Sequence, residues 1–293
     1  LGRTMPVTNT RREYFRPEDI LTEVRRAIDS HRRDEIDHIT FVGQGEPLLC
    51  ASLGELIQGV KAMTDIPVAV ITNGSLLSDA SVRQDLLAAD IVMPSLDSAD
   101  MATFRRINRP WASLRINEIV DGFAAFRREF RGDLWIEVML VRGLNDGMAR
   151  LESLRDALNR IEPDQIHLNV PTRPPAETWV RPSDHTSREC ARQILGRVAH
   201  VVAPYEGLFD PGRDAQLVDA LAQIIRRHPM SEAEFIRTVS QRHEAVTPRE
   251  AMAELLGRGL AHRVQCRGRS FLTAARGREG EKQRENHPAG HRE

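Results

Sequence analysis

Six short runs of apolar residues alternate, along the first 207 residues, with longer stretches in which apolar residues recur at helical spacing. The runs cover residues 36–43, 66–74, 90–98, 134–143, 165–171 and 200–207. A further amphipathic stretch, with Pro17 near its start, precedes the first run. Nearly continuous apolar strands that alternate with helices are typical of parallel βα units with helices on both faces of the sheet. The pattern therefore predicts an α/β fold, either a barrel or an open doubly wound sheet.

Polar residues and glycines gather where most of these runs end. The end segments read, in chain order, GQGE, TNG, SLDS, GLND, NVPTRP and APYEG. The active site of a parallel α/β fold lies at the carboxyl ends of its strands. Packing alone does not account for so many polar residues at one end of the strands, so we expect a functional cleft there.

The pattern changes at about residue 212. Helices are predicted over 212–229, 230–243 and 247–259, and two short strands around Gly268 follow them. Ser231 and Thr247 are each followed three positions later by a glutamate, which is the capping-box spacing. Two short helices and a β-hairpin have the outline of a winged-helix module.

These features divide the chain into three predicted parts: a βα domain over 1–211, a linker helix with a winged-helix-like domain over 212–273, and a tail over 274–293. The tail has almost no large apolar residue and is predicted to be disordered. Hydrophobic residues make up 41% of the chain and charged residues 28%, and the net charge is −1. No apolar run reaches the roughly 18 residues of a membrane helix. We expect a cytoplasmic protein with no membrane partner.

The end of the first run, FVGQGEPLL at 41–49, suits the amino group of an amino acid. Gly43 and Gly45 let a ligand approach the backbone N–H groups closely. The Glu46 carboxylate can accept hydrogen bonds from an ammonium group, and Pro47 fixes the turn. The alternative is a tight βα turn in which Glu46 only caps the following helix.

Three motifs in βα register together resemble the radical S-adenosylmethionine (radical SAM) superfamily. They are FVGQGEPLL, which is similar to that family's GGE motif, ITNGSLL at 71–77 and PSLDS at 94–98. INRP at 107–110 and NVPTRPP at 169–175 resemble a subgroup of Fe–S oxidoreductases related to the tRNA wybutosine-synthesis enzymes. The resemblance covers roughly residues 1–210.

The resemblance implies a partial TIM barrel that binds S-adenosylmethionine (SAM) and a 4Fe–4S cluster. In that family a cluster held by a CxxxCxxC loop reduces SAM, with electrons from a donor such as flavodoxin or ferredoxin. The 5′-deoxyadenosyl radical that results abstracts hydrogen from the substrate. The implied SAM-binding residues are Gly43, Gly45, Glu46, Thr72, Asn73, Ser95, Asp97, Glu137, Asn145, Asn169 and Val170.

Arg109 and Arg173 lie beside prolines in loops at the predicted cleft. Either side chain can hold an anionic group of a substrate bidentately, and the resemblance leaves open whether that substrate is a small molecule or an RNA. The alternative is a structural role, in which both arginines pair with carboxylates of the barrel.

The sequence departs from the family at the cluster, because it contains no CxxxCxxC motif. Its cysteines, Cys50, Cys190 and Cys266, are far apart and predict neither a disulfide framework nor a metal site, whereas a cluster needs several thiolates. The opening LGRT resembles the segment that follows the last cluster cysteine in the related oxidoreductases. We therefore expect the first strand and the cluster ligands to lie upstream of Leu1, and this chain to be catalytically inactive as it stands.

Two alternatives remain open from the sequence. One is a non-catalytic barrel that keeps a SAM-like pocket. The other is a nucleic-acid-binding protein that uses its winged helix, since phosphate contacts are common at such hairpins. The arginines around the predicted hairpin would then contact phosphates, or they would form a solvated face: Arg258, Arg263, Arg267 and Arg269.

Overall fold

A computed structural model gives the architecture of the chain and describes residues 8–43, 45–175, 177, 179–202, 217–227, 229–242 and 246–274. The chain divides into two units, Leu1–Ala203 and Pro204–Glu293. Several predictions fall outside the described residues: those on the LGRT segment, Gln44, the APYEG end, the start of the linker helix and the tail beyond 274. None of the described helices combines the length and the apolar character that a membrane crossing requires.

Six parallel strands form the sheet of the first unit, in the order β1-β2-β3-β4-β5-β6. They span Ile39–Phe41, Val68–Thr72, Ile91–Pro94, Asp133–Met139, Gln165–Asn169 and Ala199–Val201. The predicted α/β class is confirmed, and a parallel strand overlaps each of the six predicted runs.

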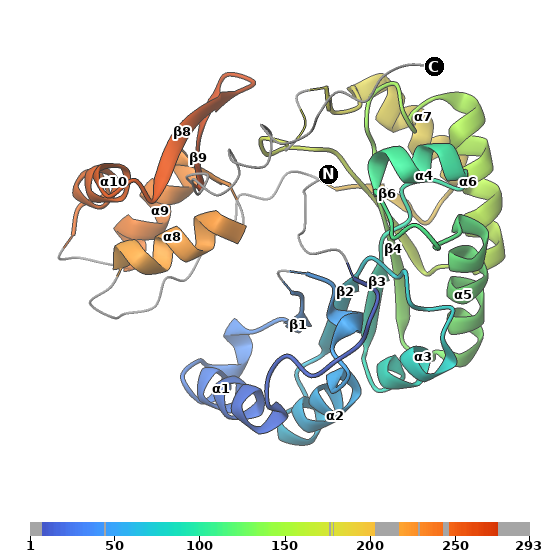
Figure 1. The fold of residues 1–293 in the computed structure, drawn as a ribbon, viewed down its shortest axis with the longest axis horizontal. Helices are drawn as coiled ribbons and strands as arrows, with labels where there is room; N and C mark the ends of the chain where they lie inside the picture. The colour runs from blue at the N-terminus through green and yellow to red at the C-terminus, as the bar shows by residue number, and fades with distance from the viewer. Residues whose placement is uncertain are drawn as a thin grey trace, which may run out of the picture. The chain divides into compact units, whose positions relative to one another are not determined.

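Helices connect these strands and lie on one face of the sheet (Figure 1). They are α1 (Pro17–Asp29), α2 (Leu53–Met63), α3 (Ala80–Leu86), α4 (Met101–Ile107), α5 (Ile116–Glu129), α6 (Met148–Ile161) and α7 (His185–Leu195). Because the strand order is sequential, right-handed crossovers bring every helix to the same face. This excludes one of the two alternatives, the doubly wound sheet, since the strand order never reverses. The expectation that helices cover both faces is wrong, because the described helices cover only one.

The burial of β4 shows how this one-sided packing sorts the side chains. Leu134, Ile136 and Val138 are fully buried against the helices, while the alternate residues Trp135 and Glu137 are only half-buried. Successive residues of a strand point to opposite faces of its sheet. The face without helices therefore carries the polar side chains of the site.

The second unit contains α8 (Leu217–Arg227), β7 (Met230–Ser231), α9 (Glu232–Arg242), α10 (Pro248–Gly257), β8 (Ala261–Cys266) and β9 (Arg269–Ala274). Its three strands form an antiparallel sheet in the order β7-β9-β8. The unit has its own buried core, which includes Leu221, Phe235, Val239, Leu255 and Leu272.

Local sequence signals in the second unit predicted its helix starts and its hairpin, but not β7, since Met230–Ser231 were assigned to the following helix. Both capping boxes are confirmed, because Ser231 and Thr247 each accept from the N–H of the glutamate three positions on and donate their own N–H to its carboxylate. The hairpin turns at Arg267 and Gly268, whose φ angles are +53° and +74°. Two central residues with positive φ are the mark of the tight hairpin turn that matches strand twist.

Candidate functional site

Neither glycine of the loop after β1 is required by the packing of the described residues. Gly43 and Gly45 are both exposed. A Cβ atom would meet nothing within 4 Å at Gly45 and only an ordinary contact of 3.4 Å at Gly43, and neither residue has a left-handed φ. The two glycines therefore leave open the space in which a ligand can approach the backbone.

Glu46 joins the ends of β1 and β2. Its carboxylate accepts from the Leu48 N–H at 3.0 Å, from the Asn73 N–H at 2.7 Å and from the Thr72 hydroxyl. The bond to Leu48 caps a short 3-10 turn over Pro47–Leu49, so the capping role weighed from the sequence is real. A carboxylate has about four acceptor positions, which leaves room for one further donor at Glu46.

The electrostatics of Glu46 favour a positively charged ligand. Burial raises the pKa of this carboxyl group, and the hydrogen bonds from Thr72, Asn73 and Leu48 oppose the rise. No cation of the described residues is among the groups that influence it. An ammonium group placed against Glu46 would offset the desolvation of its charged form.

The Asn73-Gly74 pair forms the turn after β2. The Asn73 side chain accepts from the Ser75 N–H at 2.9 Å, and the Gly74 N–H donates to the Thr72 hydroxyl at 2.9 Å. Gly74 has a φ of +68°, and a Cβ atom there would lie 2.3 Å from the ring of Phe123. The side chains of Thr72 and Asn73 thus shape this turn, and Asn73 remains exposed.

Glu137 links three neighbouring strands at the same end of the sheet. Its carboxylate accepts from the Asn169 amide at 2.7 Å and from the Ser95 hydroxyl at 3.4 Å. Ser95 and Glu137 are direct neighbours in the parallel register. The structure therefore brings together three residues that lie far apart in the sequence, and two of the roughly four acceptor positions of Glu137 stay free for a ligand.

Asp97 and Asn145 are used inside the protein. The Asp97 carboxylate accepts from the Met139 N–H at 2.8 Å and from the Asn108 amide at 2.7 Å, and its side chain is buried. Asn145, 2% exposed, donates to the carbonyls of Asp97 and Met139 at 2.8 Å and accepts from the Val141 N–H. Both residues hold the loops that follow β3 and β4. Asp97 does not cap α4, because Asp100 does so.

The remaining predicted residues have structural contacts. Val170 packs against the main hydrophobic core. The Arg109 guanidinium pairs with Glu177 at 3.1 Å, which is the structural alternative weighed for it from the sequence. Arg173 lies half-buried in the loop after β5 and interacts with other groups of the protein.

Three aromatic residues on the helix-free face were missed by the sequence analysis. Trp135 and His167 lie on adjacent strands with ring centroids 5.2 Å apart, and the buried Trp135 indole N–H has no described partner. Burial lowers the pKa of His167, and the neighbouring His200 adds to this effect while Glu137 opposes it. The signal was available: these residues alternate with buried apolar residues, so period-2 spacing places them on the same face as Glu137.

The cysteines do not fit a 4Fe–4S cluster. Cys50 follows the turn capped by Glu46, Cys190 lies in α7 and Cys266 ends β8. The described residues contain no group of three cysteine, histidine or acidic side chains that could hold a metal ion. Cluster thiolates are therefore not provided by the part of the chain that the structure describes.

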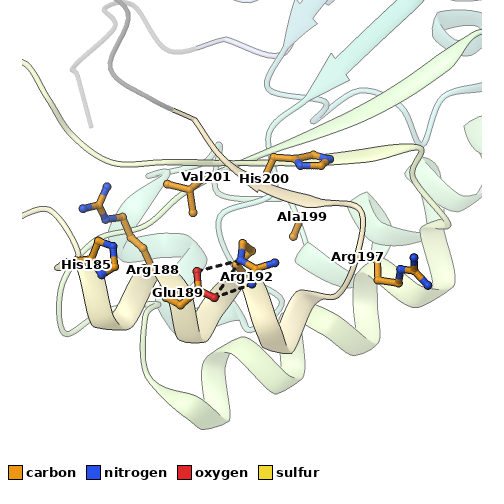
Figure 2. A pocket seen from close by; sticks show the side chains of 8 residues that line it. All are labelled: His185, Arg188, Glu189, Arg192, Arg197, Ala199, His200 and Val201. Carbon is orange, nitrogen blue, oxygen red and sulfur yellow. Dashed lines mark hydrogen bonds and ion pairs between the residues drawn. The ribbon is translucent and has the colours of Figure 1, made fainter.

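A pocket of about 420 Å³ lies elsewhere, between α7 and the edge strand β6 (Figure 2). Three of its eight lining residues are arginines, and Arg192 forms a bidentate pair with Glu189 inside it. This pair lowers the pKa of Glu189 to about 2. None of the residues predicted from the sequence lines this pocket, so the site is defined by the strand ends.

Comparison with known proteins agrees with the motifs. A model of the radical SAM superfamily matches residues 5–155. The chain is 42% identical over 160 residues to a protein of Brachyspira hyodysenteriae named GTPase Obg, covering 55% of this chain and 23% of that protein. It is 36% identical over 182 residues to a UPF0026 protein of Methanocaldococcus jannaschii, covering 62% of this chain and 56% of that protein.

A third relative matches over a larger share of its length. The chain is 32% identical over 205 residues to a UPF0026 protein of Synechocystis, covering 70% of each chain. By contrast, it spans less than two thirds of the first two relatives. The family model covers more than half of the 293 residues. The chain therefore belongs to the radical SAM superfamily.

Proposed function

We propose that the first unit is the SAM-binding part of a radical SAM enzyme and is built as a partial TIM barrel. One observation supports the proposal. The open glycine loop and two carboxylates that keep free acceptor positions, Glu46 and Glu137, all lie at the carboxyl ends of the parallel strands. Assignment to the subgroup related to wybutosine-synthesis enzymes rests on INRP and NVPTRPP, and it is part of this proposal.

Each carboxylate suits a different part of SAM. The methionine ammonium group would take the remaining acceptor position of Glu46, beside the backbone of Gly43 and Gly45. The ribose hydroxyls would donate to the free positions of Glu137, whose orientation Ser95 and Asn169 fix. Thr72 and Asp97 would support the site without contacting SAM: Thr72 positions Glu46, and Asp97 holds the loop after β3.

The reaction itself needs more than this chain supplies. In the superfamily, SAM chemistry depends on a reduced 4Fe–4S cluster, and the cysteines of residues 1–293 do not fit one. The proposal for this chain is therefore SAM binding, and its test does not require turnover.

Isothermal titration with SAM and with 5′-methylthioadenosine, which lacks the amino-acid part, tests the two roles separately. Glu46→Gln should weaken SAM binding about tenfold or more, as expected for loss of a charge-assisted hydrogen bond, and leave 5′-methylthioadenosine binding unchanged. Glu137→Gln should weaken the binding of both ligands, because both carry the ribose.

Glu152→Gln is the matched control, since Glu152 is an exposed glutamate on α6. It should bind both ligands like the parent chain. Binding of 5′-methylthioadenosine by Glu46→Gln also shows that this variant is folded. A parent chain that gives no saturable binding of SAM, or a Glu152→Gln variant that is impaired like Glu137→Gln, would contradict the proposal.

The second unit supports a separate proposal for its fold. Its elements follow the order helix, strand, helix, helix, strand, strand, and the first strand pairs with the last; this supports a winged helix. Two of the hairpin-side arginines are held within the unit, as Arg258 pairs with Asp219 and Arg263 with Glu232. A shift of duplex DNA or tRNA by the chain that weakens with salt would support nucleic-acid contact there. No shift at low salt would count against it.

A further inference from the structure

Two of the three tryptophans of the chain lie exposed in loops near the carboxyl ends of the strands. Trp111, in the loop between α4 and α5, is 40% exposed, and Trp179, in the loop after β5, is 38% exposed. An exposed indole offers a flat, apolar face with a polar N–H, which suits a planar ligand. The proposed SAM contacts use neither residue.

Two interactions join these loops into one surface. The Arg109 guanidinium pairs with Glu177 at 3.1 Å, and the Arg106 guanidinium lies 5.4 Å from the centroid of the Trp179 ring. Trp111 follows Arg109 by two residues, so their Cα atoms are at most about 7 Å apart. Trp111 therefore belongs to the same part of the surface as Trp179.

The surface is fixed to the end of the sheet. The Asn108 amide donates to the Asp97 carboxylate at 2.7 Å, and Asp97 in turn accepts from the Met139 N–H at the end of β4. Loop 108–115 thus starts from a buried anchor beside the strand ends. We call the resulting surface the tryptophan rim and define it by Arg105, Arg106, Arg109, Trp111 and Trp179.

The charge of the tryptophan rim favours an anion. Arg105 and Arg106 are exposed at the carboxyl end of α4, and neither forms an ion pair with a carboxylate of the described residues. The whole chain has a net charge of −1, so this positive charge is local. Guanidinium groups bind phosphate through paired N–H donors and also stack on aromatic faces.

We propose that the tryptophan rim binds a nucleotide unit, with the base against an indole and the phosphate on the arginines of α4. Stacking of bases on aromatic side chains combined with cationic contacts to phosphate is the general mode of single-strand and nucleotide recognition. This site is distinct from the residues proposed to hold SAM. It gives the chain a second ligand, of the class base plus phosphate.

Intrinsic fluorescence gives a direct test, because Trp135→Phe leaves only the two tryptophans of the rim. In this background we titrate guanosine 5′-monophosphate, guanosine and ribose 5-phosphate. The proposal expects saturable quenching by the nucleotide, and at least tenfold weaker binding of the two fragments. At least one of Trp111→Ala and Trp179→Ala should weaken nucleotide binding about tenfold, the size expected for loss of one stacked base.

Replacement of both Arg105 and Arg106 by Gln should reduce the affinity for the nucleotide to that for guanosine. Arg155→Gln is the matched control, since Arg155 is a partly exposed arginine on α6 that pairs with Asp156, and it should change nothing. Loss of binding in Arg155→Gln, equal binding of either fragment and the nucleotide, or no saturable quenching would overturn the proposal. Loss of the quenching in Glu137→Gln would assign the nucleotide to the SAM site and overturn the rim, while leaving the proposed function intact.

Discussion

The two carboxylates of the site differ in what holds them. Glu46 is surrounded by three donors from its own loop and from the end of β2, whereas Glu137 is oriented by side chains of the two strands that flank β4. The first arrangement leaves a single position beside open glycines, and the second leaves two positions on the helix-free face. Their different surroundings explain why we assign them different parts of one ligand.

The burial of Asp97 predicts how the stability of the folded chain depends on pH. Its burial raises its pKa from the usual 3.8 to about 6, and the Met139 N–H and the Asn108 amide oppose this rise. The folded protein therefore binds this proton more tightly than the unfolded chain does. The resulting stabilisation is complete below pH 3.8 and is lost as the pH rises through about 6.

Chemical unfolding of the parent chain and of Asp97→Asn between pH 4 and pH 7 checks this effect. The free energy of unfolding of the parent chain should fall, relative to the variant, by about 2 kcal/mol over this range. Glu46 shifts in the same direction, but it is present in both proteins and cancels in the difference. A difference that is flat or rises with pH would show that Asp97 is charged throughout.

The buried indole of Trp135 leads to a second prediction, about the free energy of unfolding. Its buried N–H has no partner among the described residues, and an unsatisfied buried donor costs about 1–3 kcal/mol. Trp135→Phe removes this cost together with some apolar contact, so the free energy of unfolding should change by less than about 1 kcal/mol. A loss of several kcal/mol in urea unfolding would mean that the indole N–H is hydrogen-bonded.

At the scale of elements, the turn from β2 into α3 depends on one residue without a side chain. Gly74 combines a φ of +68° with contact to Phe123, which is fully buried and cannot move aside easily. Gly74→Ala should therefore lower the free energy of unfolding by roughly 3 kcal/mol, the sum of left-handed strain and overpacking.

Gly143→Ala is the control for backbone strain alone. Gly143 has a similar φ of +72°, but a Cβ atom there would meet nothing within 4 Å. Its substitution should cost only about 1–2 kcal/mol. Equal losses for the two variants in urea unfolding would show that contact with Phe123 adds nothing.

The sequence pattern located the strands better than it assigned their faces. The run at 134–143 reads as nearly continuously apolar, which suggested burial on both sides, yet Trp135 and Glu137 alternate with Leu134 and Ile136. A tryptophan and a glutamate on the same face of a strand do not reveal which face of the sheet lacks helices. The placement of the helices depends on the strand order, and the strand order is set by long-range pairing rather than by local spacing.

At the scale of the whole molecule, the predicted site residues are of two kinds: some keep acceptor positions open at the strand ends, and others hold the loops in place. The motifs named all six residues, and the structure shows which of them meet: Glu46 with Thr72 and Asn73, and Glu137 with Ser95 and Asn169. They could not show that Asp97 and Asn145 use their polar atoms internally. A polar residue at a strand end looks the same in the sequence whether it faces a ligand or a neighbouring loop, since only the fold decides its partners.

The most direct test of SAM binding is an NMR titration of the 293-residue protein, in which shifts of the backbone amide signals show which residues contact SAM. Addition of SAM should shift the signals of Gly43, Gly45, Asn73, Glu137 and Asn169 most strongly, because these residues meet at the strand ends. The account would be contradicted if saturating SAM left these signals unmoved. It would also be contradicted if SAM shifted mainly the signals of α7 and β6, which line the pocket described above.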